Sequence, residues 1–286
     1  MTDRRRLHSN GRVADAALVG RVEADRFVEG EDRQVIAPVT TLWAEPCGRR
    51  EREVLFGQGF RLLEERDGFA FGYALRDGHA GYVEAEALAA PRHPVTHVVA
   101  ARMTQALTAP DFKTGAERFL LSLGARVTVE GPERPEGRWS RIATPEGALF
   151  VPSVHLRAVD RPEEDPVAVA ERLIGAPYVW GGNSALGIDC SGLVQAGCLA
   201  CGMACPGDSD LQEAELGTPV PEEAPLRRGD LLFWKGHVGW VADPDTLLHA
   251  NAHHMAVAYE PLHTAIDRIA EQGDGPVTAR KRLGDT

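Results

Sequence analysis

A cysteine and two histidines are the residues of this sequence best suited to chemistry. Cys190 lies in the segment Asp189-Cys190-Ser191-Gly192, where a glycine-rich turn gives way to a helical pattern. The positive end of the helix dipole at such a position favours thiolate over thiol. His237 is flanked by glycines at the start of an apolar run, and His249 ends the next run. A thiol, a base and an orienting group are the components of a cysteine hydrolase.

The thiol needs more than the helix to become a nucleophile. A free thiol with a pKa near 8.5 is only about 3% thiolate at pH 7, and a helix dipole lowers that pKa by roughly one unit. We therefore expect an imidazolium beside Cys190, supplied by His237. His249 is expected to bond the far nitrogen of His237 and fix its tautomer. His253 and His254, in a predicted turn, are the alternatives for that role.

Each of these residues also has a structural interpretation. Cys190 suits a small buried apolar position, and His237 suits the edge of a sheet facing water. Asp189 and Ser191 suit either the cap of the helix or a subsite beside the sulfur.

A metal site is the main chemical alternative. His249 and His253 are four residues apart but lie in a segment that predicts a strand, where they would not face one ion. Cys198, Cys201 and Cys205 are clustered, yet they lack the paired Cys-x-x-Cys spacing or second ligand group that zinc usually takes. We therefore predict no metal and no cofactor, and interpret these cysteines as packed free thiols.

Two blocks of short strands precede this region. Residues 35–92 alternate apolar runs with turns, and Asp67-Gly68 and Asp77-Gly78 are hairpin signals, which together indicate a small barrel. Residues 96–158 repeat the plan, which indicates duplication of a unit of roughly 60 residues. Both blocks end alike, and that ending resembles bacterial SH3-like domains. The predicted strands are 35–39, 53–57, 60–64, 69–73 and 80–83, then 98–100, 119–121, 126–129, 139–143 and 147–152.

The remaining chain supplies an arm, a linker and an α+β region. Residues 1–34 form a polar lead-in arm with a weak helix at 14–23. The charged stretch 158–166 is a linker that ends in a helix cap, Asp165, with Pro166 at the first helical position. A helix from Cys190 to Cys201, an irregular stretch, and strands at 231–234, 238–241, 246–249, 255–258 and 277–280 follow, and this order is typical of an α+β fold.

Composition excludes several classes of partner. The chain has 286 residues and a formal net charge of −11, which disfavours nucleic acid and anionic membranes. We see no signal peptide and no spanning segment, so we expect a cytoplasmic protein. Its five cysteines are an odd number and indicate no disulfide framework.

The motifs of residues 165–286 together resemble the NlpC/P60 family, papain-like cysteine peptidases that act on bacterial cell-wall peptides. The resemblance implies Cys190 as nucleophile, His237 as base and His249 as the third polar residue. It also implies that Tyr178 and the backbone N–H of Cys190 hold the oxyanion. The motifs that carry it are Pro177-Tyr178-Val179-Trp180-Gly181-Gly182, Asp189-Cys190-Ser191-Gly192-Leu193-Val194, Gly229-Asp230-Leu231-Leu232-Phe233, His237-Val238-Gly239 and Leu248-His249-Ala250.

The order of the regions is similar to a narrower subfamily with two SH3-like domains. Those enzymes cleave γ-D-glutamyl bonds to a diamino acid in murein peptides with a free N-terminal L-alanine. The implied fold is two small all-β SH3-like barrels, at 35–92 and 96–158, followed by an α+β papain-like catalytic domain at 165–286. The implied substrate-binding residues are Glu45 and Tyr82 from the first barrel, with Asp189, Ser191, Ser209 and Trp180. Gly207 stands where that subfamily usually has arginine.

Two functional hypotheses follow. The first is a cysteine endopeptidase that recycles small murein peptides. The second is a catalytically silent or acyl-transferring scaffold whose barrels bind a wall peptide or a protein partner. The diamino acid accepted and the oligomeric state are left open.

Overall fold

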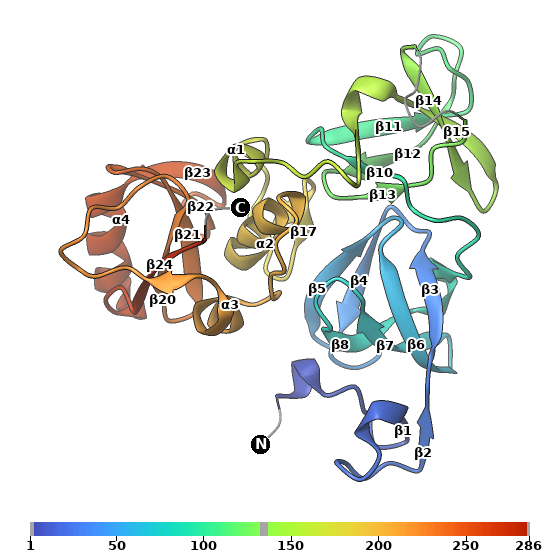
Figure 1. Cartoon of the computed structure of the whole chain (residues 1–286), viewed down its shortest axis with the longest axis horizontal. Helices are drawn as coiled ribbons and strands as arrows, with labels where there is room; N and C mark the ends of the chain where they lie inside the picture. Colours follow the sequence, from blue (N-terminus) through green and yellow to red (C-terminus); the bar gives the residue numbers. More distant parts are fainter. Residues whose placement is uncertain (1–2, 132–136, 285–286) are drawn as a thin grey trace. The chain divides into compact units, whose positions relative to one another are not determined.

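The computed structural model describes residues 3–131 and 137–284 and divides into two compact units (Figure 1). The units are Met1–Arg161 and Pro162–Thr286, so their boundary falls in the predicted linker 158–166. Each unit is described by itself below. Residues 1–2, 132–136 and 285–286 belong to the predicted arm, second block and carboxy-terminal region, and they lie outside the described residues.

A seven-stranded antiparallel sheet forms the first block of the amino-terminal unit. Its strands are β3 (Glu31–Val35), β4 (Val39–Trp43), β5 (Arg50–Leu55), β6 (Gly59–Arg66), β7 (Phe69–Ala74), β8 (Ala80–Glu84) and β9 (Leu88–Ala89), and η3 (Ala85–Ala87) is a 3₁₀ turn. The spatial order is β5-β4-β8-β7-β6-β3-β9. Asp67 and Gly68 connect β6 to β7 with φ of 51° and 81°, the backbone that a tight hairpin turn requires. The predicted strand 35–39 is wrong, since it spans the break between β3 and β4.

The second block consists of two smaller antiparallel sheets. Its strands are β10 (His97–Val99), β11 (Met103–Leu107), β12 (Glu117–Ser122), β13 (Arg126–Val127), β14 (Trp139–Thr144), β15 (Gly147–Pro152) and β16 (Leu156–Ala158), with the 3₁₀ turn η4 (Ser153–His155). One sheet has the order β13-β10-β16 and the other β12-β11-β15-β14. Leu55 and Phe56 of the first block share the core of the second with Leu121 and Ile142. That this block is a second SH3-like barrel stays a prediction.

The predicted helix at 14–23 is wrong. The segment instead contains β1 (Val13–Asp15), the 3₁₀ turn η2 (Ala16–Leu18) and, after a loop, β2 (Arg26–Val28), which pairs in parallel with β1. A further 3₁₀ turn, η1 (Arg4–Arg6), precedes them. The helix does not form because β1 pairs with β2 and packs Val13 against Leu63 and Phe71 of the first sheet. The lead-in is instead anchored at Glu64, whose carboxylate accepts hydrogen bonds from Arg12 at 2.7 Å and Arg26 at 3.1 Å.

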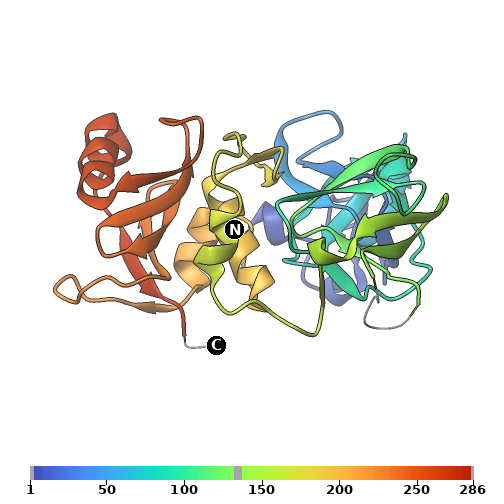
Figure 2. The ribbon, with the colours of Figure 1, turned by 90° about the horizontal axis from the view of Figure 1, so that it is seen from above.

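A six-stranded antiparallel sheet covered on both faces forms the carboxy-terminal unit. Its helices are α1 (Pro166–Glu171), α2 (Cys190–Ala200), α3 (Ser209–Glu215) and α4 (Leu262–Ile269), followed by a π-helical turn, η5 (Ala270–Asp274). Its strands are β17 (Asn183–Ser184), β18 (Gly187–Ile188), β19 (Thr218–Pro219), β20 (Asp230–Trp234), β21 (His237–Asp243), β22 (Thr246–Asn251), β23 (Ala256–Pro261) and β24 (Ala279–Arg282). The large sheet has the order β19-β24-β20-β21-β22-β23, with α1 and α2 on one side and α4 on the other (Figures 1 and 2). No helix of the described ranges is long and apolar enough to cross a bilayer.

Capping residues fix where the helices of this unit start. Asp165 accepts hydrogen bonds from Val167 N and Ala168 N, as expected for a cap followed by proline. Asp189 caps α2 through Gly192 N at 2.6 Å, which places Cys190 at the first helical position. Sequence reasoning missed α3 and α4. In α4 the buried residues Leu262, Ala265 and Ile269 have helical spacing. The helix is only eight residues long, so the periodicity is too brief to stand out in the sequence.

Gly197 lets α2 pack closely on α1. A Cβ at this position would lie 2.6 Å from the Pro166 carbonyl oxygen, which belongs to the backbone and cannot rotate away. On an unobstructed helix, Gly→Ala would add up to about 1 kcal/mol of stability.

We therefore predict that Gly197→Ala lowers the free energy of unfolding by about 1–3 kcal/mol, because the added methyl group pushes the helices apart. Urea denaturation followed by circular dichroism measures the change. An unchanged or higher stability would show that α1 yields without cost and would contradict this packing.

Candidate active site

His237 and His249 face each other across two neighbouring strands. His237 begins β21, and His249 lies on β22, with Nε2 of the first 2.9 Å from Nδ1 of the second. Gly239 makes this possible, since a Cβ there would lie 2.9 Å from Leu247 Cδ1 and 3.2 Å from His249 Cβ. Leu247 packs with Leu262 of α4, so the pair lies on the face that α4 covers.

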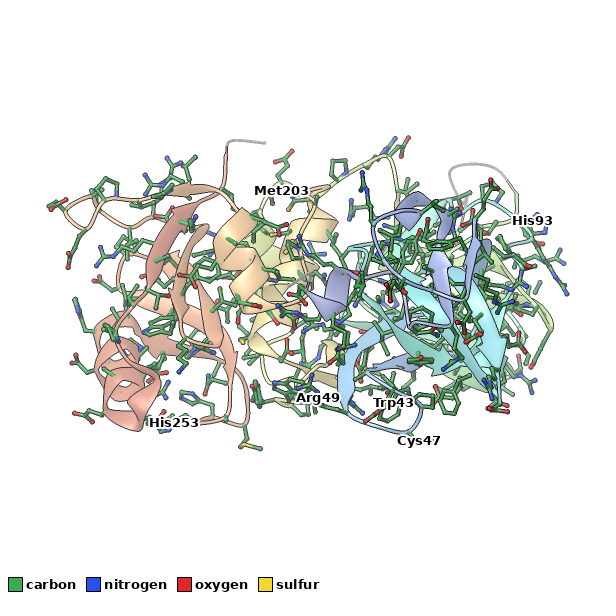
Figure 3. The ribbon with its side chains drawn as sticks, turned by 90° about the horizontal axis from the view of Figure 1, so that it is seen from below. Trp43, Cys47, Arg49, His93, Met203 and His253 are labelled. Carbon is green, nitrogen blue, oxygen red and sulfur yellow. The ribbon has the colours of Figure 1, made fainter. Side chains whose placement is uncertain are left out.

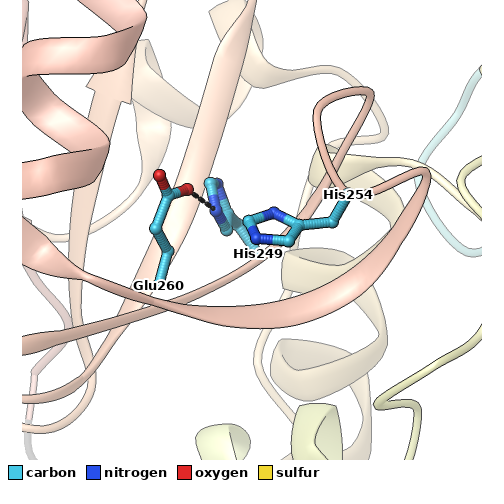
Figure 4. Close-up of side chains that lie close together, drawn as sticks. All are labelled: His249, His254 and Glu260. Carbon is cyan, nitrogen blue, oxygen red and sulfur yellow. Dashed lines mark hydrogen bonds and ion pairs between the residues drawn. The ribbon is translucent and has the colours of Figure 1, made fainter.

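Two further residues, Glu260 and Arg268, extend the hydrogen bonding beyond the two histidines, and sequence reasoning missed both. His249 Nε2 lies 3.0 Å from Glu260 Oε2 (Figure 4). Arg268 of α4 donates to both oxygens of that carboxylate, at 2.8 Å through Nε and 2.7 Å through Nη2. We call His237, His249, Glu260 and Arg268 the relay. Strand register is the signal that could have identified Glu260. His249 pairs with Ala258, and Glu260, two residues further along β23, is a diagonal neighbour on the same face of the sheet.

Burial sets the charge of the relay. It lowers the pKa of His237 to about 3, and the neighbouring His249 and Arg268 act in the same direction. Burial also lowers the pKa of His249, while Arg268 holds the pKa of Glu260 far below its usual range. Both rings are therefore neutral at pH 7 beside an ionised carboxylate. This corrects the expectation of a resting imidazolium at His237, because a buried cationic ring loses its hydration.

The β20–β21 hairpin brings Cys190 to this group. Cys190 Sγ lies 4.0 Å from the carbonyl oxygen of Gly236, the residue that precedes His237. The sulfur belongs to a residue that is 6% exposed, so it is close to the surface without being open to it. Helix α2 packs on β21 and β22 and thus presents its first residue at the strand that begins with His237.

Tyr178 lies close enough to Cys190 for the two side chains to influence each other's charge. Burial raises the pKa of the Tyr178 hydroxyl, and the nearby Cys190 and Asp189 raise it further. The hydroxyl is therefore a proton donor at neutral pH. Its backbone is fixed by a hydrogen bond to Met255 O at 3.0 Å and a bridge to Ile188.

Asp189 and Ser191 have structural hydrogen bonds in addition to their nearness to the sulfur. The Asp189 carboxylate accepts from Gly192 N at 2.6 Å, Gly181 N at 2.8 Å and Ser191 Oγ at 3.0 Å. It therefore ties the Gly181 turn to the first turn of α2. Both residues are buried.

Trp180 and Ser209 lie on segments that border α2. Trp180 is 53% exposed in the loop before β17. Ser209 is the first residue of α3, and its neighbour Gln212 is fully buried. Gln212 Nε2 donates to Ser191 O and to Pro206 O, both at 2.9 Å. Gln212, which sequence reasoning quoted only as part of a motif, thus ties α3 to the start of the nucleophile helix.

Glu45 and Tyr82 lie in the amino-terminal unit. Glu45 is exposed in the turn from β4 to β5, which also carries the labelled Cys47 and Arg49 in Figure 3. Tyr82 is on β8, opposite Trp43, with its ring 4.9 Å from that of Phe71. The two units are described separately, so the substrate roles of both residues stay predictions.

The donor atoms of His249, His254 and Glu260 lie within 4.8 Å of one another, a set that suits a divalent metal by type (Figure 4). The carboxylate is already paired with Arg268 at 2.7 Å, and that cation would repel a metal ion, so we assign none here. His254 and His253 lie in the turn between β22 and β23.

The clustered cysteines contribute to packing. Cys198, Cys201 and Cys205 are buried free thiols. Cys205 Sγ accepts a hydrogen bond from Gln212 at 3.5 Å. These contacts match the interpretation of packed thiols.

Two segments of the chain match known protein families. Residues 175–268 match the NlpC/P60 family, and residues 42–88 match the bacterial dipeptidyl-peptidase SH3 domain. These matches identify an NlpC/P60 domain at residues 175–268, preceded by an SH3-like domain at residues 42–88.

Individual relatives support that assignment. Dipeptidyl-peptidase 6 of Lysinibacillus sphaericus is 27% identical over 237 residues, which are 76% of this chain and 86% of that protein. The gamma-D-glutamyl-L-lysine dipeptidyl-peptidase of Bacillus subtilis is 32% identical over 40% of this chain and 42% of its own length. A crystal structure of an NlpC/P60 family protein from Bacillus cereus shares the fold, with a TM-score of 0.74, 18% identity, and coverage of 88% of this chain and 99% of that one.

The low pKa of His237 predicts a loss of stability in mild acid. An ordinary histidine titrates near 6.5, so the unfolded chain takes up this proton first, and its contribution to stability is lost as the pH falls from about 6.5 toward 3. The slope is at most about 1.4 kcal/mol per pH unit, which gives up to about 2 kcal/mol between pH 6.5 and 5. His237 as a whole residue is half-buried, so the measured loss is expected below that bound.

Urea denaturation of the wild type and of His237→Gln at pH 7 and pH 5 measures this contribution. The variant should lose less stability on acidification, because it lacks the buried ring that takes up a proton more readily in the unfolded chain. An identical loss in the two proteins would contradict a neutral buried ring.

Proposed function

We propose that this chain is a cysteine endopeptidase that cleaves the bond between γ-D-glutamate and a diamino acid in murein peptides with a free N-terminal L-alanine. The observation that carries the proposal is the hairpin that places Cys190 Sγ beside the residue before His237, with His237 bonded to His249. The similarity of this chain to the gamma-D-glutamyl-L-lysine dipeptidyl-peptidases of Bacillus subtilis and Bacillus cereus supports the choice of bond.

The proposed reaction begins with an uncharged Cys190 thiol and an uncharged His237 ring. As Cys190 Sγ attacks the γ-carbonyl carbon, His237 Nδ1 takes the thiol proton, because its Nε2 is bonded to His249. The backbone N–H of Cys190 and the Tyr178 hydroxyl hold the oxyanion. His237 then gives its proton to the leaving amine, and the amine departs with the diamino acid. Water, deprotonated by His237, attacks the thioester and releases L-Ala-D-Glu together with the regenerated thiol.

We propose that carboxylates and an aromatic ring of the protein bind the free N-terminal amine of the substrate. An ammonium group needs anionic partners, and Glu45 offers an exposed carboxylate. Asp189 adds charge beside the nucleophile, although its oxygens already accept three hydrogen bonds. The other residues proposed to contact substrate are Tyr82 of the amino-terminal unit and Trp180, Ser191 and Ser209 of the carboxy-terminal unit. A role in cytoplasmic recycling of such peptides belongs to the same proposal.

The substrate is tested by incubating the chain with L-Ala-γ-D-Glu-L-Lys, its diaminopimelate counterpart and the N-acetylated form of each, with products read by mass spectrometry. We expect L-Ala-D-Glu from the free peptides, at least tenfold less from the acetylated ones, and none with Cys190→Ala. Equal cleavage of free and acetylated peptides would remove the free-amine requirement. Absence of cleavage of all four, with binding retained, would instead favour the scaffold hypothesis.

A further inference from the structure

We propose that Glu260, paired with Arg268, is a positioning residue that sets the tautomer of both active-site histidines. The inference rests on the proposed function, because it deepens the role of His237 as a base. Neither residue is expected to touch substrate, since Glu260 lies on β23 beyond His249 and Arg268 lies on α4 beyond Glu260. Glu260 acts through two successive hydrogen bonds.

The direction of the hydrogen bonds follows from the carboxylate. An ionised Glu260 only accepts, so the 3.0 Å contact requires a proton on His249 Nε2. A neutral His249 then has a bare Nδ1, which accepts from His237 Nε2 across 2.9 Å. A neutral His237 protonated at Nε2 has its lone pair on Nδ1. That nitrogen has no hydrogen-bond partner among residues 3–131 and 137–284 and is the atom that the reaction needs as a base.

Arg268 keeps the Glu260 carboxylate ionised in mild acid. Burial raises the pKa of Glu260, whereas the two hydrogen bonds from Arg268 lower it by more. The other titratable groups that face His249 are His237 on β21 and His254 in the β22–β23 turn. Without Arg268, the buried carboxyl group would take up a proton in mild acid and could then offer His249 a donor in place of an acceptor. Both histidines would lose their fixed tautomer.

A matched ion pair in the same unit separates this role from simple stabilisation. Asp230 is fully buried, and Arg282 donates to its two oxygens at 2.7 and 2.6 Å. This pair joins β20 to β24, whereas Glu260 lies on β23, and β21 and β22 separate β23 from β20 and β24 in the sheet order. Asp230→Asn thus makes the same carboxylate-to-amide change at an equally buried arginine pair.

The first experiment reads the tautomers directly. Long-range ¹H–¹⁵N spectra of the full-length, ¹⁵N-histidine-labelled protein at pH 7 should show His237 and His249 neutral and protonated at Nε2. In Glu260→Gln an amide offers either an oxygen or an NH₂ group, so we expect a mixture of tautomers. Asp230→Asn should leave both signals unchanged, and Glu260→Asp should retain them at least in part. A wild-type His249 protonated at Nδ1, or an unaltered spectrum in Glu260→Gln, would overturn the proposal.

The second experiment reads catalysis with L-Ala-γ-D-Glu-L-Lys as substrate. Glu260→Gln should lower kcat at least about tenfold with little change in KM, with roughly 10⁴-fold as the limit set by inverting the tautomer in a serine-protease triad. Arg268→Met should shift the acid limb of kcat/KM to higher pH, while Asp230→Asn should not. If Arg268→Met lowers kcat/KM equally at every pH and leaves the acid limb where it is in the wild type, the role of the arginine is overturned. Because the spectra need no substrate, inactivity of the wild type on this peptide would refute the proposed function and leave the tautomer test intact.

Discussion

A hydrogen-bonded series that crosses the sheet from β21 to α4 is the interaction on which the site depends. It begins at His237, passes through His249 and Glu260, and ends at Arg268. A carboxylate at its inner end fixes which ring nitrogens are protonated. The nitrogen nearest the proposed chemistry is thereby left bare. Burying a neutral base costs less free energy than burying a charged one, because a charged ring would lose its hydration.

The fold supplies the geometry that this series needs. Gly239 leaves room for His249 beside β21, and the hairpin turn at Gly236 brings the Cys190 sulfur to the same end of the sheet. Asp189 fixes the start of α2 and ties it to the preceding turn, so the nucleophile has little freedom to move. Gln212 adds a second attachment from α3. The thiol is therefore held by α2 and the base by β21, and α2 packs on the sheet that contains β21.

Local sequence signals predicted the parts of the site that depend on neighbouring residues. The cap at Asp189 and the helix from Cys190 follow from a few adjacent residues, and His237 and His249 stand out at the start and the end of predicted apolar runs. Glu260 and Arg268 could not be found in this way, because their role depends on the register of β22 with β23 and on an α4 that the sequence patterns did not reveal. The imidazolium was wrongly expected for a related reason, since burial of His237 is a property of the packed sheet. The helix at 14–23 failed because the pairing of β1 with β2 and the packing of Val13 on Leu63 and Phe71 are contacts that the local pattern does not show.

A structure with a bound aldehyde tests the central claim most directly. The compound is the γ-aldehyde analogue of L-Ala-D-Glu, which a thiol converts to a tetrahedral thiohemiacetal that mimics the proposed intermediate. We predict a covalent bond from Cys190 Sγ to the former aldehyde carbon, with its oxygen near Tyr178 Oη and His237 Nδ1 within hydrogen-bond distance of the adduct. An aldehyde bound without a covalent bond, attached to another cysteine, or placed out of reach of the His237 ring would contradict the account.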